Sequence, residues 1–448
     1  MGRAISFDTA VARIVLAVVF LHTTACASLA TKAEARGADA VTEWTLIADC
    51  YANGAANWRT LAIMHRAMHD ALNAVQSVYA RWSPPSPGEP PPGGANTEVA
   101  MASAADEVLT LLHPDRASET AKAFATVLSR YPDDASKAAG RALGAAIGRA
   151  AVERRAGDGF DQVRYFKGDE APARWRPTPN LFQTSRTNES RPFLFDTVAD
   201  VPTLPPPARG TPLYLDQLAE TRRLGGLRAS ERTPQQTNDA YFWAYQSSQR
   251  GFVELAVRLL AARRPKAGVY AEARLLAQLT AALADSAILT WHEKAQYAAW
   301  RPVTAIRADG GDPAWEALIE TPPFPEYPSG HATDCYTGAG VLEAAFSNLQ
   351  GPIVYESSAH MQPLTAATAA PVDLGMGQHA QWAGEEAPGG NERRFASLAA
   401  AAENCARSRI WAGAHFAAAE TESERLAGII VRKALAATPS LLDSRDGL

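Results

Sequence analysis

Residues 269–302 read VYAEARLLAQLTAALADSAILTWHEKAQYAAWRP, and their apolar positions follow a helical pattern as far as residue 300. Pro302 indicates that the regular helix ends or kinks there. Alanine dominates the whole chain and aromatic residues make up only 8% of it, a composition that favours helix over sheet. The stretch therefore predicts a mainly helical protein.

Further helical patterns flank this stretch on both sides, and no strand-like alternation of useful length occurs. They cover 59–79, 97–112, 116–130, 136–155, 233–243, 252–263, 332–347, 391–406 and 420–437. Between them, 157–230 is rich in proline and 351–390 is loop-like. We expect an all-α helical bundle with long irregular loops.

Three regions follow an N-terminal segment of 27 residues. They are an N-terminal helical region (28–156), a proline-rich excursion with a connecting helix (157–250), and a C-terminal helical region that holds the polar motifs (251–448). The excursion is expected to be ordered because its aromatic residues need somewhere to pack. These are Trp175, Phe182, Phe193, Phe195 and Tyr214.

A glycine repeat marks the helical pattern over 136–155. Gly140, Gly144 and Gly148 recur at every fourth residue, a spacing that resembles a membrane dimerisation face. Arg141 and Arg149 lie in the same stretch. The charges favour close helix packing in a soluble bundle.

Length and charge limit the possible functions. The chain has 448 residues, of which 47% are hydrophobic, so it can bury one large core or two modest ones. The formal net charge is -5 and no run of Lys and Arg stands out, so we expect no nucleic-acid partner. Any anion site must be a local arrangement. No segment after the N-terminus is long and uncharged enough to cross a membrane.

The N-terminus is typical of an export signal. Arg3 and Arg13 precede the apolar run Ile14–Leu21, and small residues allow cleavage after Ala27 or Ala30. We therefore expect 1–27 to be a signal peptide and the protein to be periplasmic or secreted. A short first helix or a membrane anchor is the alternative.

The cysteines leave room for little covalent cross-linking. Cys26 would suggest a lipid anchor, but Thr23 stands where that signal usually has leucine. Signal cleavage leaves Cys50, Cys335 and Cys405, which allow at most one disulfide and a free thiol.

The first polar motif is Lys294-Ala-Gln-Tyr-Ala-Ala-Trp-Arg301-Pro302. The two cations are seven positions apart, which on a continuous helix places them two turns apart on one face. A guanidinium offers forked donors to an oxyanion, and an ammonium adds a compact charge. The spacing predicts that both cations reach one ligand, although paired cations on a helix are usually solvated.

The second motif, Pro328-Ser329-Gly330-His331, comes directly before a helical pattern. Glycine lets the backbone approach a ligand, and amides at a helix N-terminus favour an anion. Ser329 adds a hydroxyl, and His331 can exchange protons near neutral pH. By itself, this motif is also a common turn followed by a helix cap.

The third motif, Ser408-Arg409-Ile-Trp-Ala-Gly413-Ala-His415, needs a bend. Arg409 and His415 are six residues apart and would diverge around a straight helix, but Gly413 permits the chain to turn. A neutral imidazole at His415 could attack phosphorus or bond to a metal oxide.

Together and in this order, the three motifs resemble the signature of the vanadium haloperoxidase and type-2 phosphatidic acid phosphatase superfamily. The resemblance is strongest over 285–415 and implies that superfamily's helical bundle. It implies that His415 is the axial ligand of vanadate, or the nucleophile of a phosphatase, and that His331 handles protons. The residues implied to hold the oxyanion are Lys294, Arg301, Ser329, Gly330 and Arg409.

Two features favour the haloperoxidase branch. Trp291 and Phe324 stand where chloroperoxidases carry aromatic residues beside the metal, and the gap from His331 to Ser408 is long. This branch implies an exported enzyme that uses vanadate and hydrogen peroxide to oxidise halide, with Lys294 polarising the reactive oxygen. The alternatives are a soluble phosphomonoesterase that acts on a small phosphate ester without a cofactor, and a non-catalytic oxyanion-binding relic.

One position departs from the family pattern. The family usually carries Asp four residues after the last histidine, whereas this chain has Ala419 followed by Glu420. If an acid must orient His415, Glu420 is the nearest candidate in sequence. The alternative is that a backbone carbonyl or a distant Asp orients His415, which would leave Glu420 as a solvated surface charge.

Other histidines and a repeated motif are interpreted as structural or exposed. His65 and His69 are four apart on a helix and could bind zinc, but no glutamate of the metalloprotease pattern lies between them. His292 should point away from Lys294, and His360 and His379 lie in a loop. Trp175-Arg176-Pro177 resembles Trp300-Arg301-Pro302 but lacks the lysine seven residues before its arginine.

Overall fold

A computed structural model describes residues 40–49, 51, 55–162, 164–177, 184–185, 189–228, 231–244, 247–263, 268–349, 351–356 and 392–437. The predicted signal peptide, Cys50, Phe182 and the loop histidines His360 and His379 lie outside the described residues. The described part is predominantly helical, which confirms the predicted all-α class.

The first eight α-helices in chain order are α2 (Ala40–Asp49), α3 (Ala55–Val75), α4 (Thr97–Leu112), α5 (Ala117–Leu128), α6 (Ala135–Glu153), α7 (Pro212–Leu224), α8 (Pro234–Ala244) and α9 (Ser248–Ala262). They are followed by α10 (Val269–Tyr297), α11 (Pro302–Asp309), α12 (Gly330–Ala345), α13 (Leu398–Trp411) and α14 (Ala417–Ala437). The strands are β1 (Arg164–Tyr165), β2 (Thr184–Ser185), β3 (Ile353–Glu356) and β4 (Glu392–Phe395). β1 pairs with β2 and β3 with β4, both antiparallel.

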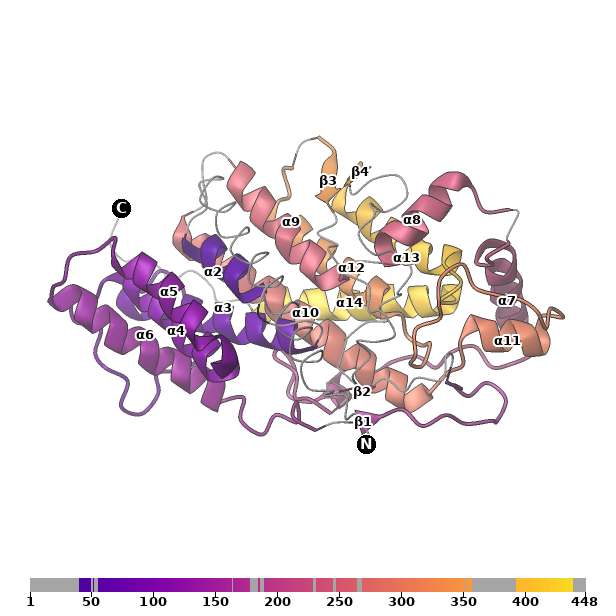
Figure 1. The fold of residues 1–448 in the computed structure, drawn as a ribbon, viewed down its shortest axis with the longest axis horizontal. Coiled ribbons are helices and arrows are strands. Elements are labelled where there is room, and N and C mark those ends of the chain that lie inside the picture. Colours follow the sequence, from indigo (N-terminus) through magenta and orange to yellow (C-terminus); the bar gives the residue numbers. More distant parts are fainter. Residues whose placement is uncertain are drawn as a thin grey trace, which may run out of the picture.

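The long helix α10 lies at the centre of the molecule (Figure 1). It packs against α3 on one side and against α12 and α14 on the other. Its residues from Leu275 to Trp291 are buried without a break, so it has no solvent-facing stripe over that length. A helix that is apolar all round belongs inside a core. One hydrophobic cluster accordingly runs from α2 and α3 through α10 to α14.

Helices α4 and α6 pack closely at the predicted glycine repeat. A Cβ atom on Gly144 would lie 2.0 Å from the carbonyl oxygen of Ala100, and one on Gly140 would lie 2.7 Å from that of Asn96. Backbone atoms cannot give way to a new side chain, so only glycine fits here. The glycines therefore serve close helix packing, as the arginines beside them indicated.

We expect Gly144→Ala to lower the free energy of unfolding by ~1–3 kcal/mol or more, because the new methyl group must push α6 away from α4. Urea unfolding followed by circular dichroism measures this. Gly428→Ala is the matched control, since a Cβ there meets only the end of the Arg432 side chain, at 3.4 Å. The control should gain up to ~1 kcal/mol from better helix propensity. Destabilisation of both variants to the same degree would contradict the packing argument.

The proline-rich excursion is more regular than predicted. It contains α7, which begins where the Thr211 hydroxyl accepts a hydrogen bond from the Tyr214 amide and Pro212 occupies the first turn. These local start signals were obscured by the surrounding prolines. Of the aromatic residues expected to pack, Trp175, Phe195 and Tyr214 are buried, and Phe193 packs partly buried against the core. Helices α2 and α11 and the β3–β4 pair were also missed.

No helix in the described part of the chain combines the length and the hydrophobicity that a membrane span requires. Nor do the described residues contain a group of three or more His, Cys, Asp or Glu side chains that could hold a metal ion. His65 and His69 instead lie in the core, where Thr45 Oγ1 is 3.3 Å from His65 Nε2. Burial lowers the pKa of His65 to about 3. The zinc alternative therefore has no third ligand within these residues.

Candidate oxyanion-binding site

The structure brings the three polar motifs together where α10, α12, α13 and α14 meet. Lys294 lies in the last turn of α10, and Gly330 and His331 begin α12. Arg409 lies in the last turn of α13, and His415 in the short connection to α14. All the predicted oxyanion-binding and catalytic side chains in this cluster are nearly inaccessible to solvent. Three buried cations, Lys294, Arg301 and Arg409, converge on His415 from three separate segments.

Arg301 does not lie on the same helix as Lys294, so the expected two-turn spacing is wrong. Helix α10 ends at Tyr297, and Ala298 adopts a left-handed conformation with φ 43°. Arg301 is extended (φ -79°, ψ 158°) because the residue before a proline is disfavoured in a helix. Arg301 is the N-cap residue of α11, and its side chain reaches the site from the irregular segment between α10 and α11.

Gly413 makes the bend that the third motif requires. Its φ is +72°, and a Cβ atom there would lie 2.4 Å from the carbonyl oxygen of Gly225. The chain turns back at this point, so that the amides of Ala414 and His415 both donate to the Arg409 carbonyl, at 3.0 and 3.3 Å. The turn brings His415 back to the end of the helix that carries Arg409.

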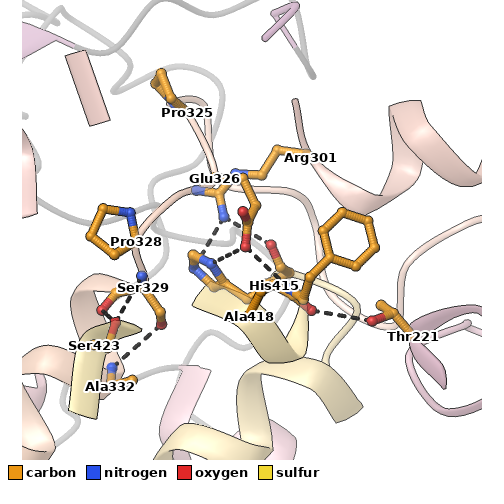
Figure 2. A network of polar contacts seen from close by, with 12 residues as sticks. Thr221, Arg301, Pro325, Glu326, Pro328, Ser329, Ala332, His415, Ala418 and Ser423 are labelled. Carbon is orange, nitrogen blue, oxygen red and sulfur yellow. Dashed lines mark hydrogen bonds and ion pairs between the residues drawn. The ribbon is translucent and has the colours of Figure 1, made fainter. Parts of the chain in front are cut away.

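Ser329 caps α12, and a serine of α14 holds it in place. The Ser329 hydroxyl accepts from the amide of Ala332 at 3.4 Å. Ser423 Oγ accepts from the Ser329 amide at 3.0 Å and donates to the Ser329 carbonyl at 2.9 Å (Figure 2). A Cβ atom on Gly330 would meet only a methyl group of Thr290, at 3.9 Å. The backbone at Gly330 is therefore uncrowded, as an approach to a ligand requires.

Lys294 holds the loop before Ser329. Its ammonium group donates to the carbonyl oxygens of Pro325, Glu326 and Pro328, at 3.0, 2.8 and 2.5 Å. These three bonds use all the protons of the group. In this state Lys294 therefore organises the loop, and a contact with an oxyanion would require one of the bonds to be shared or released.

Arg301 links this loop to His415. Its Nε donates to the Phe324 carbonyl at 2.8 Å, and its Nη1 donates to the Ala414 carbonyl at 2.9 Å. The same Nη1 lies 3.1 Å from His415 Nε2 (Figure 2). Arg301 Nη2 is buried and makes no hydrogen bond within the described residues. A donor left over in this position suits a ligand oxygen.

An acid missed in the sequence contacts the other ring nitrogen. Glu326 Oε1 lies 2.9 Å from His415 Nδ1 and accepts from the Phe416 amide at 3.1 Å. Figure 2 shows the Glu326 carboxylate and the Arg301 guanidinium next to each other beside the His415 ring. Glu326 and His415 are 89 residues apart, and no periodicity connects them. Only the neighbouring motif at 328–331 could have drawn attention to this loop.

Burial and neighbouring charges shift the pKa values of the ionisable groups in the cluster. Burial lowers the pKa of His415 well below its usual value of 6.5, and Arg301 and Lys294 lower it further. Burial also lowers the pKa of Lys294, and it lowers that of Arg301 to about 9. Burial raises the pKa of Glu326 to about 7, although Lys294 lowers it in part. The site therefore holds a neutral imidazole among cations that an anion would stabilise.

Aromatic rings form one side of the cluster. Trp291 and Phe324 pack with their ring centroids 4.9 Å apart. The Phe324 ring lies 4.7 Å from the guanidinium carbon of Arg301 and 5.3 Å from Lys294 Nζ. The structure thus places both predicted pocket aromatics beside the cations, where they exclude water and strengthen the local electrostatics.

Glu420 neither orients His415 nor lies on the surface, so both predictions for this residue are wrong. Ala419 is buried against Ala299 and Tyr327, and Glu420 is buried, so it is not a solvated surface charge. Burial raises the pKa of Glu420 well above 4.5, while Arg409 lowers it in part. Glu420 does not contact His415, because Glu326 occupies the Nδ1 side of the ring. The orienting acid comes from a loop and not from α14.

A disulfide joins the two helices beside the cluster. Cys335 of α12 is bonded to Cys405 of α13, and the Cys405 sulfur lies 3.7 Å from the carbonyl oxygen of His331. The bond ties the helix that begins at His331 to the helix that ends near Arg409. This is the single disulfide that the cysteine count allowed.

Residues 274–444 match the family model of the VCPO second helical-bundle domain. The match covers the C-terminal part of the chain, which carries the three motifs. Every residue of the cluster, from Trp291 to Ser423, lies within the matched residues. The resemblance inferred from the three motifs is therefore confirmed.

Individual relatives agree with this assignment. The vanadium chloroperoxidase of Curvularia inaequalis is 33% identical over 198 residues, which cover 37% of this chain and 32% of that protein. The match thus spans about a third of the length of that relative. A bacterial vanadium-dependent iodoperoxidase superposes with a TM-score of 0.70 at 21% identity, covering 91% of this chain and 96% of that chain.

A second solved structure, a bacterial vanadium-dependent chloroperoxidase, superposes with a TM-score of 0.62 at 15% identity. It covers 87% of this chain and 94% of that one. These two likenesses show that nearly the whole chain has the haloperoxidase fold.

Proposed function

We propose that the protein is a vanadate-dependent haloperoxidase-like enzyme, which oxidises halide to hypohalous acid with hydrogen peroxide. One observation carries the proposal: a neutral His415 imidazole lies among buried cations, with its Nε2 directed at Arg301. An imidazole lone pair surrounded by fixed positive charge suits a metal oxyanion, because the nitrogen can bind the metal and the charged donors can bind its oxygens.

The residues of the cluster fit vanadate. His415 Nε2 would hold the vanadium, and the unused Arg301 Nη2 and the Arg409 guanidinium would bind the oxygens. The uncrowded backbone at Gly330 and the Ser329 hydroxyl would complete the cradle. Bound vanadate would supply Lewis acidity that activates hydrogen peroxide.

The surrounding side chains would keep water out of the site and would transfer protons during the reaction. Trp291 and Phe324 exclude bulk water from the cationic side of the site. His331, close enough to His415 to affect its pKa, would give and take protons during the reaction. Lys294 would act through the loop that it holds and through its charge.

A phosphomonoesterase is the competing function, because phosphate and vanadate have the same shape. In that case, the neutral His415 Nε2 would attack phosphorus and His331 would protonate the leaving alcohol. The geometry of the cluster is compatible with both reactions. A non-catalytic oxyanion-binding protein, the third alternative, would perform neither.

We further propose that the protein is exported. The N-terminal pattern of two arginines, an apolar run and small residues supports this. The Cys335–Cys405 disulfide supports it independently, because structural disulfides persist mainly in oxidising compartments.

A paired assay on the purified chain tests the proposed reaction. We expect bromide-dependent oxidation of a dye by hydrogen peroxide after loading with orthovanadate, and little hydrolysis of a generic phosphate ester. Added phosphate should inhibit the oxidation by competing for the same cradle. Ester hydrolysis without oxidation would assign the site to a phosphatase, and neither reaction would identify a relic.

A further inference from the structure

We propose that Glu326 is the positioning residue that holds His415 as its Nδ1-protonated tautomer, which leaves Nε2 unprotonated so that an oxyanion can replace Arg301 Nη1 as its partner. This role deepens the proposed function and rests on it only in taking His415 as the oxyanion ligand. It also answers how the chain works without the acid that the family carries four residues after this histidine.

The tautomer follows from the two neighbours of the ring. A guanidinium has only donors, so Arg301 Nη1, 3.1 Å away, can approach His415 Nε2 only if that nitrogen is an acceptor. The single proton of a neutral ring must then be on Nδ1. Glu326 Oε1 lies 2.9 Å from Nδ1 and accepts this proton in a hydrogen bond. Both ring nitrogens are thereby assigned.

Hydrogen bonds hold both the backbone around Glu326 and its carboxylate group. On the loop side, the Glu326 amide donates to the Ala299 carbonyl at 2.9 Å, and Lys294 Nζ binds the Glu326 carbonyl. The Tyr327 hydroxyl next to it donates to the Leu204 carbonyl at 2.7 Å. On the other side, Oε1 also accepts from the Phe416 amide, just before α14. A side chain held in this way can set the orientation of the ring as well as its tautomer.

The bond to the Phe416 amide raises a purely structural alternative. Glu326 could stabilise only the start of α14, where backbone amides need acceptors. The two roles differ in what they predict for the ring. A cap alone affects the stability of the protein, whereas a positioning residue also affects the tautomer and the affinity of Nε2 for an oxyanion.

The nearby acids do not share this arrangement. Glu420 is buried on α14, where the charge of Arg409 lowers its pKa in part, and no hydrogen bond joins its carboxylate to His415. Glu422, also buried on α14, bonds to Arg425 and to the Leu204 amide. Glu422 therefore provides a matched control: a buried carboxylate on the adjoining helix that does not touch the ring.

The test compares Glu326→Ala, Glu326→Gln and the control Glu422→Gln with the wild-type protein. The chain has nine histidines, so long-range proton–nitrogen spectra of protein labelled with 15N in histidine resolve the tautomers, and the His415→Gln variant assigns the His415 signal. Orthovanadate binding is measured in parallel by ultraviolet difference titration, and stability by urea unfolding.

We expect wild type and Glu422→Gln to show His415 protonated on Nδ1. Glu326→Ala should shift the ring toward a mixture of tautomers and weaken vanadate binding by ~10–100-fold. Glu326→Gln, which keeps the size and one acceptor oxygen, should fold even if the alanine variant does not, and should weaken binding by about 10-fold, because it lacks the charge that makes Nε2 more basic.

A wild-type tautomer and wild-type vanadate affinity in both Glu326 variants would overturn the proposal, and reduced stability alone would show that Glu326 is a helix cap. Failure of the proposed function is a different result. In that case the wild-type protein would not bind vanadate, while its His415 spectrum would still report the tautomer and its dependence on Glu326.

Discussion

Replacing His415 with alanine is expected to abolish orthovanadate binding and to lower turnover by ~10³-fold or more, because the variant loses the neutral nitrogen that lies among the buried cations. His331→Ala should behave differently. It should slow turnover by ~10²–10⁴-fold, the usual effect of losing a general acid or base, and leave vanadate binding largely intact.

Ultraviolet difference titration with orthovanadate and the bromide oxidation assay measure the two effects separately. His292→Ala is the control, since this histidine lies on α10 two residues before Lys294, only partly buried. It should retain wild-type binding and turnover. Equal loss of binding in the His415 and His331 variants would refute the roles assigned to the two histidines.

Replacing Lys294 with methionine is expected to lower the free energy of unfolding by ~3–5 kcal/mol. Methionine fills the same space but leaves the carbonyl groups of Pro325, Glu326 and Pro328 without their donor. It also leaves the Glu326 carboxylate with one fewer cation in a buried site. Because this loop carries Glu326 and leads into Ser329, vanadate binding should be lost as well.

Urea unfolding followed by circular dichroism measures the stability of the Lys294 variant, and vanadate titration under conditions where it remains folded measures its binding. Lys433→Met is the control: this lysine is exposed on α14 and lies over the Phe195 ring, 5.6 Å from its centroid. The control should differ little from wild type. Wild-type stability in the Lys294 variant would show that its three hydrogen bonds do not hold the loop.

The sequence predicted which residues form the site better than it predicted how they reach it. The three motifs identified the cations and both histidines because residue type and order are local properties. The helical spacing of Lys294 and Arg301 misled, because Ala298 ends α10 between them. The bend at Gly413 was predictable, because a turn with a positive φ favours glycine and a glycine can be recognised in the sequence.

Glu326 could not have been predicted in the same way. Its partner is distant in the chain, and its flanking prolines indicate only an irregular segment. The expectation for Glu420 failed for a related reason. The first turn of α14 faces the interior, so an acid that looks like a surface charge in sequence is buried beside Arg409. Contacts between side chains on different segments cannot be predicted from the periodicity of either segment.

The disulfide between Cys335 and Cys405 bears on how the site holds together. The two cysteines are 70 residues apart, and the β3–β4 ladder pairs Ile353 with Phe395 inside that interval. The disulfide and the ladder therefore close the same part of the chain twice, once covalently and once by hydrogen bonds. Because the covalent link keeps α12 and α13 together even when the ladder opens, His331 and Arg409 stay attached to one scaffold.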